Sequence, residues 1–75
     1  MIDGDNLWIG TYARGIHVYN TKTKSLSVFK HSSDRKNSIN DDGIYALCKT
    51  KNGDIYVGTH AGLNKYDRYK NELLT

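Results

Sequence analysis

One stretch of this chain occurs twice, at a spacing that few folds produce. NLWIGT at residues 6–11 returns as DIYVGT at residues 54–59, so 48 positions separate Gly10 from Gly58. The likeness continues downstream, where it pairs Ala13, Gly15, Ile16, Tyr19 and Asn20 with Ala61, Gly62, Leu63, Tyr66 and Asp67. A period between about 20 and 50 residues is typical of solenoids, propellers and repeat arrays. We therefore expect a repeat architecture with about one and a half copies, and one copy cannot bury its own apolar faces.

Length and composition limit the chain to at most one small domain, with 75 residues of which 37% are hydrophobic. No apolar run approaches the roughly 18 residues needed to span a membrane. The segment 1–5 lacks the basic and apolar regions of a signal peptide. Because the repeat begins almost at once, we expect Met1 to be an internal start within a longer protein. The net charge of +3 is scattered among acids, which favours a solvated surface over a nucleic-acid interface or a membrane contact.

Motifs for catalysis and for metal binding are missing from the sequence. Cys48 is the only cysteine, which excludes an internal disulfide and a cysteine-based zinc site, and its apolar neighbours predict a buried, inert thiol. The three histidines have no short ligand spacing. The pair Asp41-Asp42 can form a turn or a weak cation site, but it lacks the alternating acids of a calcium loop. We therefore expect no cofactor, no metal and no catalytic constellation within this chain.

Short runs of β-branched and aromatic residues, separated by Gly, Asn and Asp, predict an all-β chain. The expected strands are 7–11, 15–20, 26–31, 43–49, 54–59 and 63–66, with the start of another at 72–74. The run 43–49 is apolar on both faces, as expected for a strand buried on both sides. Asn52-Gly53 predicts a type I′ hairpin turn, and Asp5 is expected in the left-handed position that Gly53 takes in the second copy.

Four short strands per period, joined by tight turns and followed by a longer link, describe one blade of a β-propeller. We therefore expect a partial β-propeller, about one and a half blades of four-stranded antiparallel sheet. With strands lettered A to D from the channel outward, residues 1–31 would supply strands B, C and D of one blade, and residues 32–42 the link. Residues 43–75 would supply strands A, B and C and the start of D of the next blade. A single open sheet or small barrel of seven strands is the alternative, but a barrel has no reason to repeat at this spacing.

The repeated positions are expected to be structural. Trp8 and its counterpart Tyr56 point away from the aliphatic residues beside them, so they would fill the wedge between blades. The glycine two positions later sits where a strand bulges or approaches another backbone closely. The threonine after it ends the strand and can bond the following turn. The full set of structural repeat positions is Trp8, Gly10, Thr11, Gly15, Tyr19, Gly53, Tyr56, Gly58, Thr59, Gly62 and Tyr66.

At these residues the chain resembles the two-component regulator propeller repeat. Residues 5–20 and 53–67 follow that family's sequence of a turn, Asn-Leu-Trp-Ile-Gly-Thr, a Gly-rich turn and Gly-Leu-Asn-Arg-Tyr-Asp, and residues 37–47 resemble its link into the next blade. Asp5 for the turn glycine, Tyr56 for the tryptophan and the short turn 59–62 depart from the pattern. The resemblance implies a periplasmic or otherwise extracytoplasmic sensor propeller of hybrid two-component histidine kinases of the Bacteroidetes. It also implies oligosaccharides as the usual ligands and further blades of the parent chain as partners.

The residues leave two other functions open. The chain could be part of a propeller enzyme, a lyase or a hydrolase, whose catalytic side chains would come from several blades. It could also be a self-assembling interaction module, because a partial blade leaves unpaired strand edges and several copies could close a ring. The chain by itself is expected to be non-enzymatic and poorly stable, since about three stacked repeats are normally needed for a continuous core.

Loop geometry selects the candidate ligand site. In a blade the B–C turn and the D-to-A link lie on the same face of the disc, and propeller ligands usually sit at a channel mouth, on loops held by a rigid scaffold. On that face we expect Tyr12, Arg14, His60, Arg35, Lys36, Asp41 and Asp42. Tyr12 and Arg14 are favoured, because an aromatic ring and a guanidinium group can hold a sugar ring with its hydroxyls or an acidic substituent. His60, the counterpart of Tyr12, and Arg35 are weaker candidates, and all four could equally be ordinary exposed loop residues. His17 and His31 are expected to lie within strands and to serve in packing.

Overall fold

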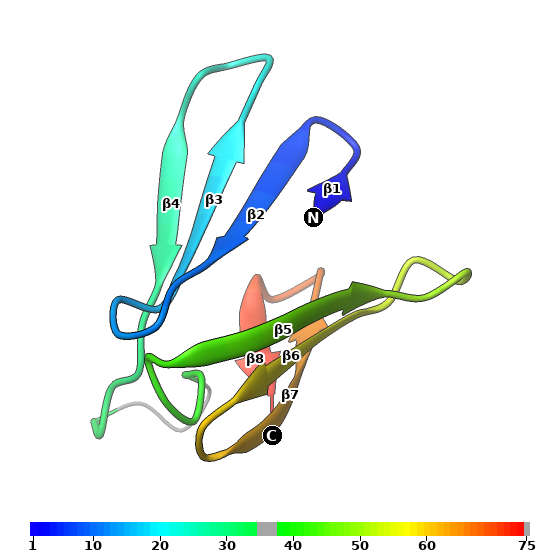
Figure 1. Ribbon diagram of the computed structural model, residues 1–75. Helices are drawn as coiled ribbons and strands as arrows, with labels where there is room; N and C mark the ends of the chain where they lie inside the picture. Colours follow the sequence, from blue (N-terminus) through cyan, green and yellow to red (C-terminus); the bar gives the residue numbers. More distant parts are fainter. Residues whose placement is uncertain (35–37, 75) are drawn as a thin grey trace.

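The computed structural model describes residues 1–34 and 38–74, which form eight β-strands in two separate sheets (Figure 1). The first sheet, which we call blade 1, contains β1 (Ile2–Asp3), β2 (Asn6–Gly10), β3 (Ile16–Asn20) and β4 (Leu26–Phe29). The second, blade 2, contains β5 (Ile44–Lys49), β6 (Ile55–Thr59), β7 (Gly62–Asp67) and β8 (Glu72–Leu74). Both sheets are antiparallel and keep their strands in chain order. The predicted all-β fold with four-stranded units is confirmed, and no helix occurs in the described ranges.

β1 is a strand that the sequence pattern did not predict. Ile2 pairs with Leu7, and Asp3 pairs with Asn6. Blade 1 therefore has a short first strand, where we expected only its later three. β4 ends at Phe29 instead of continuing to residue 31, so the expected place of His31 within a strand is wrong.

The two hairpin turns differ from the predicted type I′ geometry. Gly53 N donates to the carbonyl of Thr50 at 3.0 Å, and Gly53 is left-handed with φ 86°, whereas Asn52 is not. This is a three-residue loop closed by a left-handed glycine, an arrangement common in hairpins. In blade 1 the left-handed residue is Gly4, with φ 60°, and not Asp5. Both turn predictions are wrong for the same reason: a single glycine meets the positive-φ requirement in each loop.

The core lies between the two sheets, and one face of each contributes to it. Its buried apolar side chains are Trp8, Ile16, Val18, Ile39, Ile44, Ile55, Val57 and Leu73. Trp8, only 2% exposed, stacks on Phe29 with ring centroids 5.7 Å apart and meets Tyr66 of blade 2 edge-on at 4.9 Å. Aromatic pairs in these geometries contribute about 0.5–1.5 kcal/mol beyond their buried area. The interface between the sheets is therefore centred on a three-ring cluster.

Close approach of the sheets depends on Gly10. A Cβ on Gly10 would lie 2.7 Å from Cγ2 of Ile44, so a larger residue there would push β2 and β5 apart. At the matching Gly58 a Cβ would find nothing nearer than Ala46, at 3.8 Å. The same repeat position is thus crowded between the sheets and uncrowded on the far side of blade 2.

Each sheet has a second face, which we call its open face. The strand registers place Leu7, Ile9, His17, Tyr19, Leu26 and Val28 on the open face of blade 1. They place Ala46, Cys48, Tyr56, Gly58, Leu63, Lys65 and Leu74 on that of blade 2. Several of these apolar side chains are largely exposed, because no described segment covers either face.

The open face of blade 2 explains two further corrections. Cys48 is exposed, so the predicted buried thiol is wrong. The prediction that β5 is buried on both sides is also wrong. Ile44 is the one fully buried residue of β5, and alternate side chains of the strand point to the uncovered face. No helix of the described residues is long and apolar enough to cross a membrane.

Candidate functional site

Three segments that are distant in sequence meet at one edge of the two blades, which we call the turn edge. They are the β2–β3 turn, the β6–β7 turn and the link that precedes β5 (Figure 1). Gly15 N donates to the carbonyl of Asp42 at 2.9 Å, and Ile44 N donates to that of Thr11 at 2.7 Å. His60 N in turn donates to the carbonyl of Gly43 at 3.1 Å. Backbone hydrogen bonds therefore join both turns to the link and hold the turn edge as one surface.

The two turns are stabilised in the same way by the repeated threonine. Thr11 Oγ1 donates to the carbonyl of Gly15 at 2.8 Å, and Thr59 Oγ1 donates to that of Gly62 at 2.9 Å. Each hydroxyl also accepts a backbone N–H from within its own turn. These bonds fix the turn backbone and leave the side chains between the threonine and the glycine directed outward.

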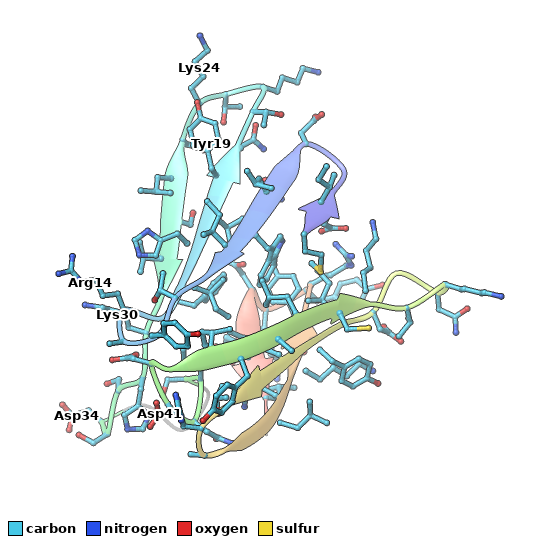
Figure 2. The ribbon with its side chains drawn as sticks, in the orientation of Figure 1. Arg14, Tyr19, Lys24, Lys30, Asp34 and Asp41 are labelled. Carbon is cyan, nitrogen blue, oxygen red and sulfur yellow. The ribbon has the colours of Figure 1, made fainter. Side chains whose placement is uncertain are left out.

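The outward side chains include the candidates chosen from the sequence. Tyr12 is 82% exposed, and Arg14 and His60 are exposed as well. Arg14 projects away from the sheets at the turn edge, where Lys30 also lies (Figure 2). Arg35 lies outside the described residues, as does Lys36. The structure thus brings three of the four ligand candidates to the same edge.

Tyr45 is a site residue that sequence reasoning missed. Its hydroxyl is hydrogen-bonded to Nδ1 of His60, and the two ring centroids are 4.0 Å apart. The register of β5 against β6 shifts between Ile44 and Ala46, so Tyr45 is the extra residue of a β-bulge. Bulges re-aim side chains, and Tyr45 is 63% exposed although its neighbour Ile44 is buried. A strand pattern cannot reveal this, because alternation alone assigns each residue to one face of a regular strand.

The aromatic residues border a hollow at the turn edge. It has a volume of about 300 Å³ and is lined by Gly10, Thr11, Tyr12, Ile44 and Tyr45. Its walls therefore come from both blades, with one exposed tyrosine from each. A hollow with aromatic walls, hydroxyl groups and a neighbouring imidazole can take a small ligand that has both apolar and hydrogen-bonding surface.

The acidic pair of the link has a structural role. Oδ1 of Asp42 accepts the backbone N–H of His31 at 2.6 Å, and Oδ1 of Asp41 accepts that of Gly43 at 2.7 Å. His31 Nδ1 is in hydrogen-bond contact with the carbonyl of Ile39 at 2.8 Å. Within residues 1–34 and 38–74, no group of three His, Cys, Asp or Glu side chains is placed to hold a metal ion.

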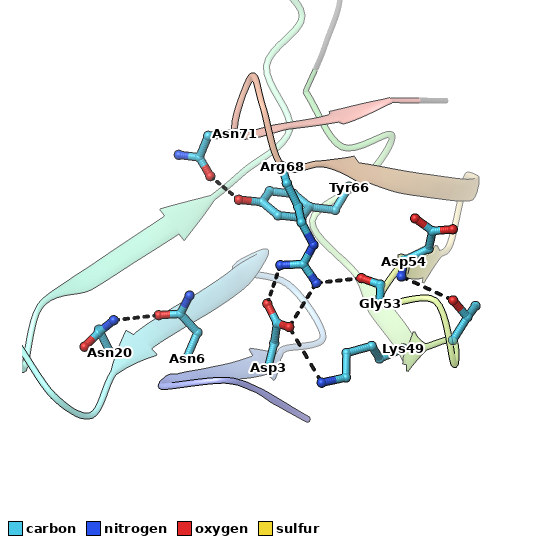
Figure 3. Close-up of polar contacts among 10 residues, drawn as sticks. Asp3, Asn6, Asn20, Lys49, Gly53, Asp54, Tyr66, Arg68 and Asn71 are labelled. Atoms are coloured by element: carbon cyan, nitrogen blue, oxygen red, sulfur yellow. Dashed lines mark hydrogen bonds and ion pairs between the residues drawn. The ribbon is translucent and has the colours of Figure 1, made fainter.

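The opposite edge carries the ion pairs that join the blades (Figure 3). Arg68 of blade 2 donates from both terminal nitrogens to the carboxylate of Asp3 in blade 1, each at 2.9 Å, and also to the carbonyl of Gly53 at 2.6 Å. Lys49 Nζ lies 3.7 Å from the same carboxylate. The hydrogen bonds from Arg68 hold the pKa of Asp3 below its usual range, against the opposing effect of partial burial. The charges at this edge therefore fasten the sheets together, which leaves the turn edge as the candidate site.

Comparisons with known proteins identify the repeat. Residues 38–61 match the family model described as "Two component regulator propeller". A crystal structure, described as the extracellular domain of a one-component system from B. thetaiotaomicron, is similar to this chain with a TM-score of 0.83 and 32% sequence identity. The match covers 97% of this chain and 9% of that structure's chain. No curated protein matches the chain. The resemblance to the two-component regulator propeller repeat and the partial β-propeller fold, both expected from the sequence, are confirmed.

Proposed function

We propose that this chain, which carries the two-component regulator propeller repeat, is a segment of an extracytoplasmic sensor propeller that binds an oligosaccharide at the turn edge. The family match and the extracellular origin of the similar structure support a sensor outside the cytoplasm. Further blades of a parent chain are the partners that the proposal requires, because the segment spans 9% of the similar chain. The proposal assigns ligand binding and no catalysis to these residues.

The observation that carries the proposal is that the β2–β3 turn, the β6–β7 turn and the link before β5 converge on one rigid edge. Ligand-binding residues are commonly found on loops positioned by a rigid scaffold, and here hydrogen bonds of 2.7–3.1 Å join the loops to one another. Preorganised loops lose little conformational entropy on binding, so more of the contact energy is available for affinity.

The side chains at the turn edge suit a sugar. A pyranose ring has an apolar face of C–H groups, which can stack on the rings of Tyr12 and Tyr45, and a rim of hydroxyls. His60 and the two tyrosine hydroxyls can exchange hydrogen bonds with that rim. Arg14 can donate to ring hydroxyls or pair with an acidic substituent.

A titration of the isotope-labelled chain with a panel of neutral and acidic oligosaccharides tests the proposal. We expect amide shifts confined to the turn edge, at least a tenfold loss of affinity in Tyr12→Ala, and a selective loss of acidic ligands in Arg14→Ala. Tyr69→Ala is the matched control, because Tyr69 is fully exposed in the β7–β8 turn, away from the turn edge. Shifts that map to the open faces, or an equal loss in the control variant, would contradict the assigned site.

A further inference from the structure

His60 in the β6–β7 turn is held by two residues at the start of blade 2. Its backbone N–H donates to the carbonyl of Gly43 at 3.1 Å. Its ring lies against the same glycine, because a Cβ on Gly43 would come within 2.6 Å of Nε2 of His60. The ring also contacts that of Tyr45, with centroids 4.0 Å apart, and Nδ1 shares a hydrogen bond of 2.5 Å with the Tyr45 hydroxyl. The imidazole is therefore confined although it lies at the surface.

The matching position in blade 1 lacks this support. Tyr12 is the counterpart of His60, and its side chain is 82% exposed and makes no hydrogen bond within residues 1–34 and 38–74. The support of His60 comes from the β-bulge between Ile44 and Ala46, which turns Tyr45 out of the regular strand alternation. A confined side chain loses little conformational entropy when a ligand binds. Of these two turn residues, His60 is therefore the preorganised one.

The direction of the hydrogen bond decides which nitrogen of His60 carries the ring proton. The hydroxyl of Tyr45 can donate or accept, and so can Nδ1, according to the tautomer. A phenol O–H is a stronger donor than the N–H of a neutral imidazole, and an unprotonated ring nitrogen is a stronger acceptor than a phenol oxygen. The bond therefore runs from the Tyr45 hydroxyl to Nδ1, and the proton of the neutral ring lies on Nε2.

His31 has the opposite arrangement. Its Nδ1 lies 2.8 Å from the carbonyl oxygen of Ile39, and because a carbonyl oxygen can only accept, Nδ1 of His31 carries the proton. The ring of His17 makes no hydrogen bond to any described residue, and it lies on the open face of blade 1. The three histidines of the chain thus provide an internal comparison between an Nε2–H ring, an Nδ1–H ring and an unconstrained one.

We propose that Tyr45 is a positioning residue of the turn edge, which fixes His60 as a hydrogen-bond donor through Nε2. The inference rests on the oligosaccharide site proposed above and specifies the group that His60 meets there. That group is an acceptor oxygen, such as a ring oxygen, a carboxylate or an acetamido carbonyl. Nε2 has no hydrogen-bond partner among the described residues, so it is available to a ligand. Arg14 also offers only donors, so the turn edge favours sugars that present acceptor oxygens.

Nitrogen-15 NMR of the imidazole rings tests the tautomers without any ligand. At about pH 8.5 an ordinary imidazole is neutral, and its protonated and unprotonated nitrogens have well-separated chemical shifts. We expect Nε2–H for His60, Nδ1–H for His31 and a mixture for His17. Tyr45→Phe keeps the ring contact but removes the hydroxyl. The Nδ1 resonance of His60 should then shift toward that of His17, and His31 should not change.

Tyr69→Phe is the matched control for the loss of a hydroxyl. Tyr69 is fully exposed in the β7–β8 turn, away from the turn edge, so the variant should leave all three histidine spectra unchanged. It should also leave the binding of oligosaccharides unchanged.

Binding of the oligosaccharide panel separates the positioning role from a direct contact. Tyr45→Phe should weaken binding about two- to tenfold, the effect of one hydrogen bond. In His60→Gln the side-chain amide supplies an N–H donor that does not depend on Tyr45. Adding Tyr45→Phe to His60→Gln should therefore cause no further loss, which a double-mutant cycle measures.

Three results would overturn the proposal. They are an Nδ1–H tautomer for His60, a His60 spectrum that Tyr45→Phe leaves unchanged, and an equal loss of affinity from Tyr45→Phe in both backgrounds. The last would mean that the hydroxyl contacts the ligand directly. If the tautomers are as expected but no oligosaccharide of the panel binds, the proposed function fails, whereas the control of the His60 tautomer by Tyr45 stands.

Discussion

Replacing Trp8 by alanine removes the largest side chain between the two blades. Trp8 is 2% exposed and contacts the rings of Phe29 and Tyr66. Truncation of a buried tryptophan to alanine typically costs about 3–5 kcal/mol, which combines lost transfer free energy with the cavity left behind. The internal repeat supplies a matched control, since Tyr56 occupies the same position on the open face of blade 2 and is only half-buried. We expect Tyr56→Ala to cost about 1 kcal/mol or less.

Urea denaturation followed by far-ultraviolet circular dichroism measures both free energies of unfolding by linear extrapolation. A chain of this size holds only about 3–5 kcal/mol of stability, so Trp8→Ala is expected to be unfolded at 25 °C. Trp8→Phe, with a smaller loss, then supplies a measurable value. Equal losses for the substitutions at Trp8 and Tyr56 would refute the reasoning, because they would mean that the two faces are covered to the same extent.

Three further predictions rest on single positions. Gly10→Ala should lower the free energy of unfolding by about 1–3 kcal/mol, because the added methyl group overpacks against β5. Gly58→Ala should leave that free energy unchanged or raise it slightly. Thermal denaturation of the two variants tests the difference. Hydrogen bonds from Arg68 lower the pKa of Asp3 in the folded state. The stability that the ionised Asp3 contributes is therefore fully present above the unfolded pKa of 3.8, and it is lost as the pH falls through the lower folded pKa. Asp3→Asn should therefore lower the free energy of unfolding by about 1 kcal/mol at neutral pH. It should also weaken the fall of that free energy as the solution is acidified. Lys24 is left-handed with φ 63°, so Lys24→Gly should stabilise the chain by about 1 kcal/mol, and an unchanged denaturation midpoint would count against that strain.

Much of the fold is predictable because the chain repeats itself. The period indicates a blade, and alternation along residues 6–11 and 54–59 separates the two faces of each sheet. Directions of successive strands then place Tyr12, Arg14 and His60 at one edge without any knowledge of distances. These inferences need only local periodicity and the reversal of the chain at each turn, which the sequence displays directly.

The missed features depend on contacts between segments far apart in sequence. The bulge that turns Tyr45 outward arises from the pairing of β5 with β6 and has no signature in a single strand. The ion pair of Asp3 with Arg68 joins residues 65 positions apart, across an interface whose register no local pattern fixes. The apolar neighbours of Cys48 predict a buried thiol, but in a propeller segment such residues also face the position of the next blade.

The packing of two successive blades against each other is tested most directly by nuclear Overhauser contacts of the single tryptophan. The indole protons of Trp8 should show cross-peaks to the ring of Tyr66, whose centroid lies 4.9 Å away, in the unmodified chain. Contacts of Trp8 with blade 1 alone, and none with any residue beyond 43, would contradict the two-blade arrangement.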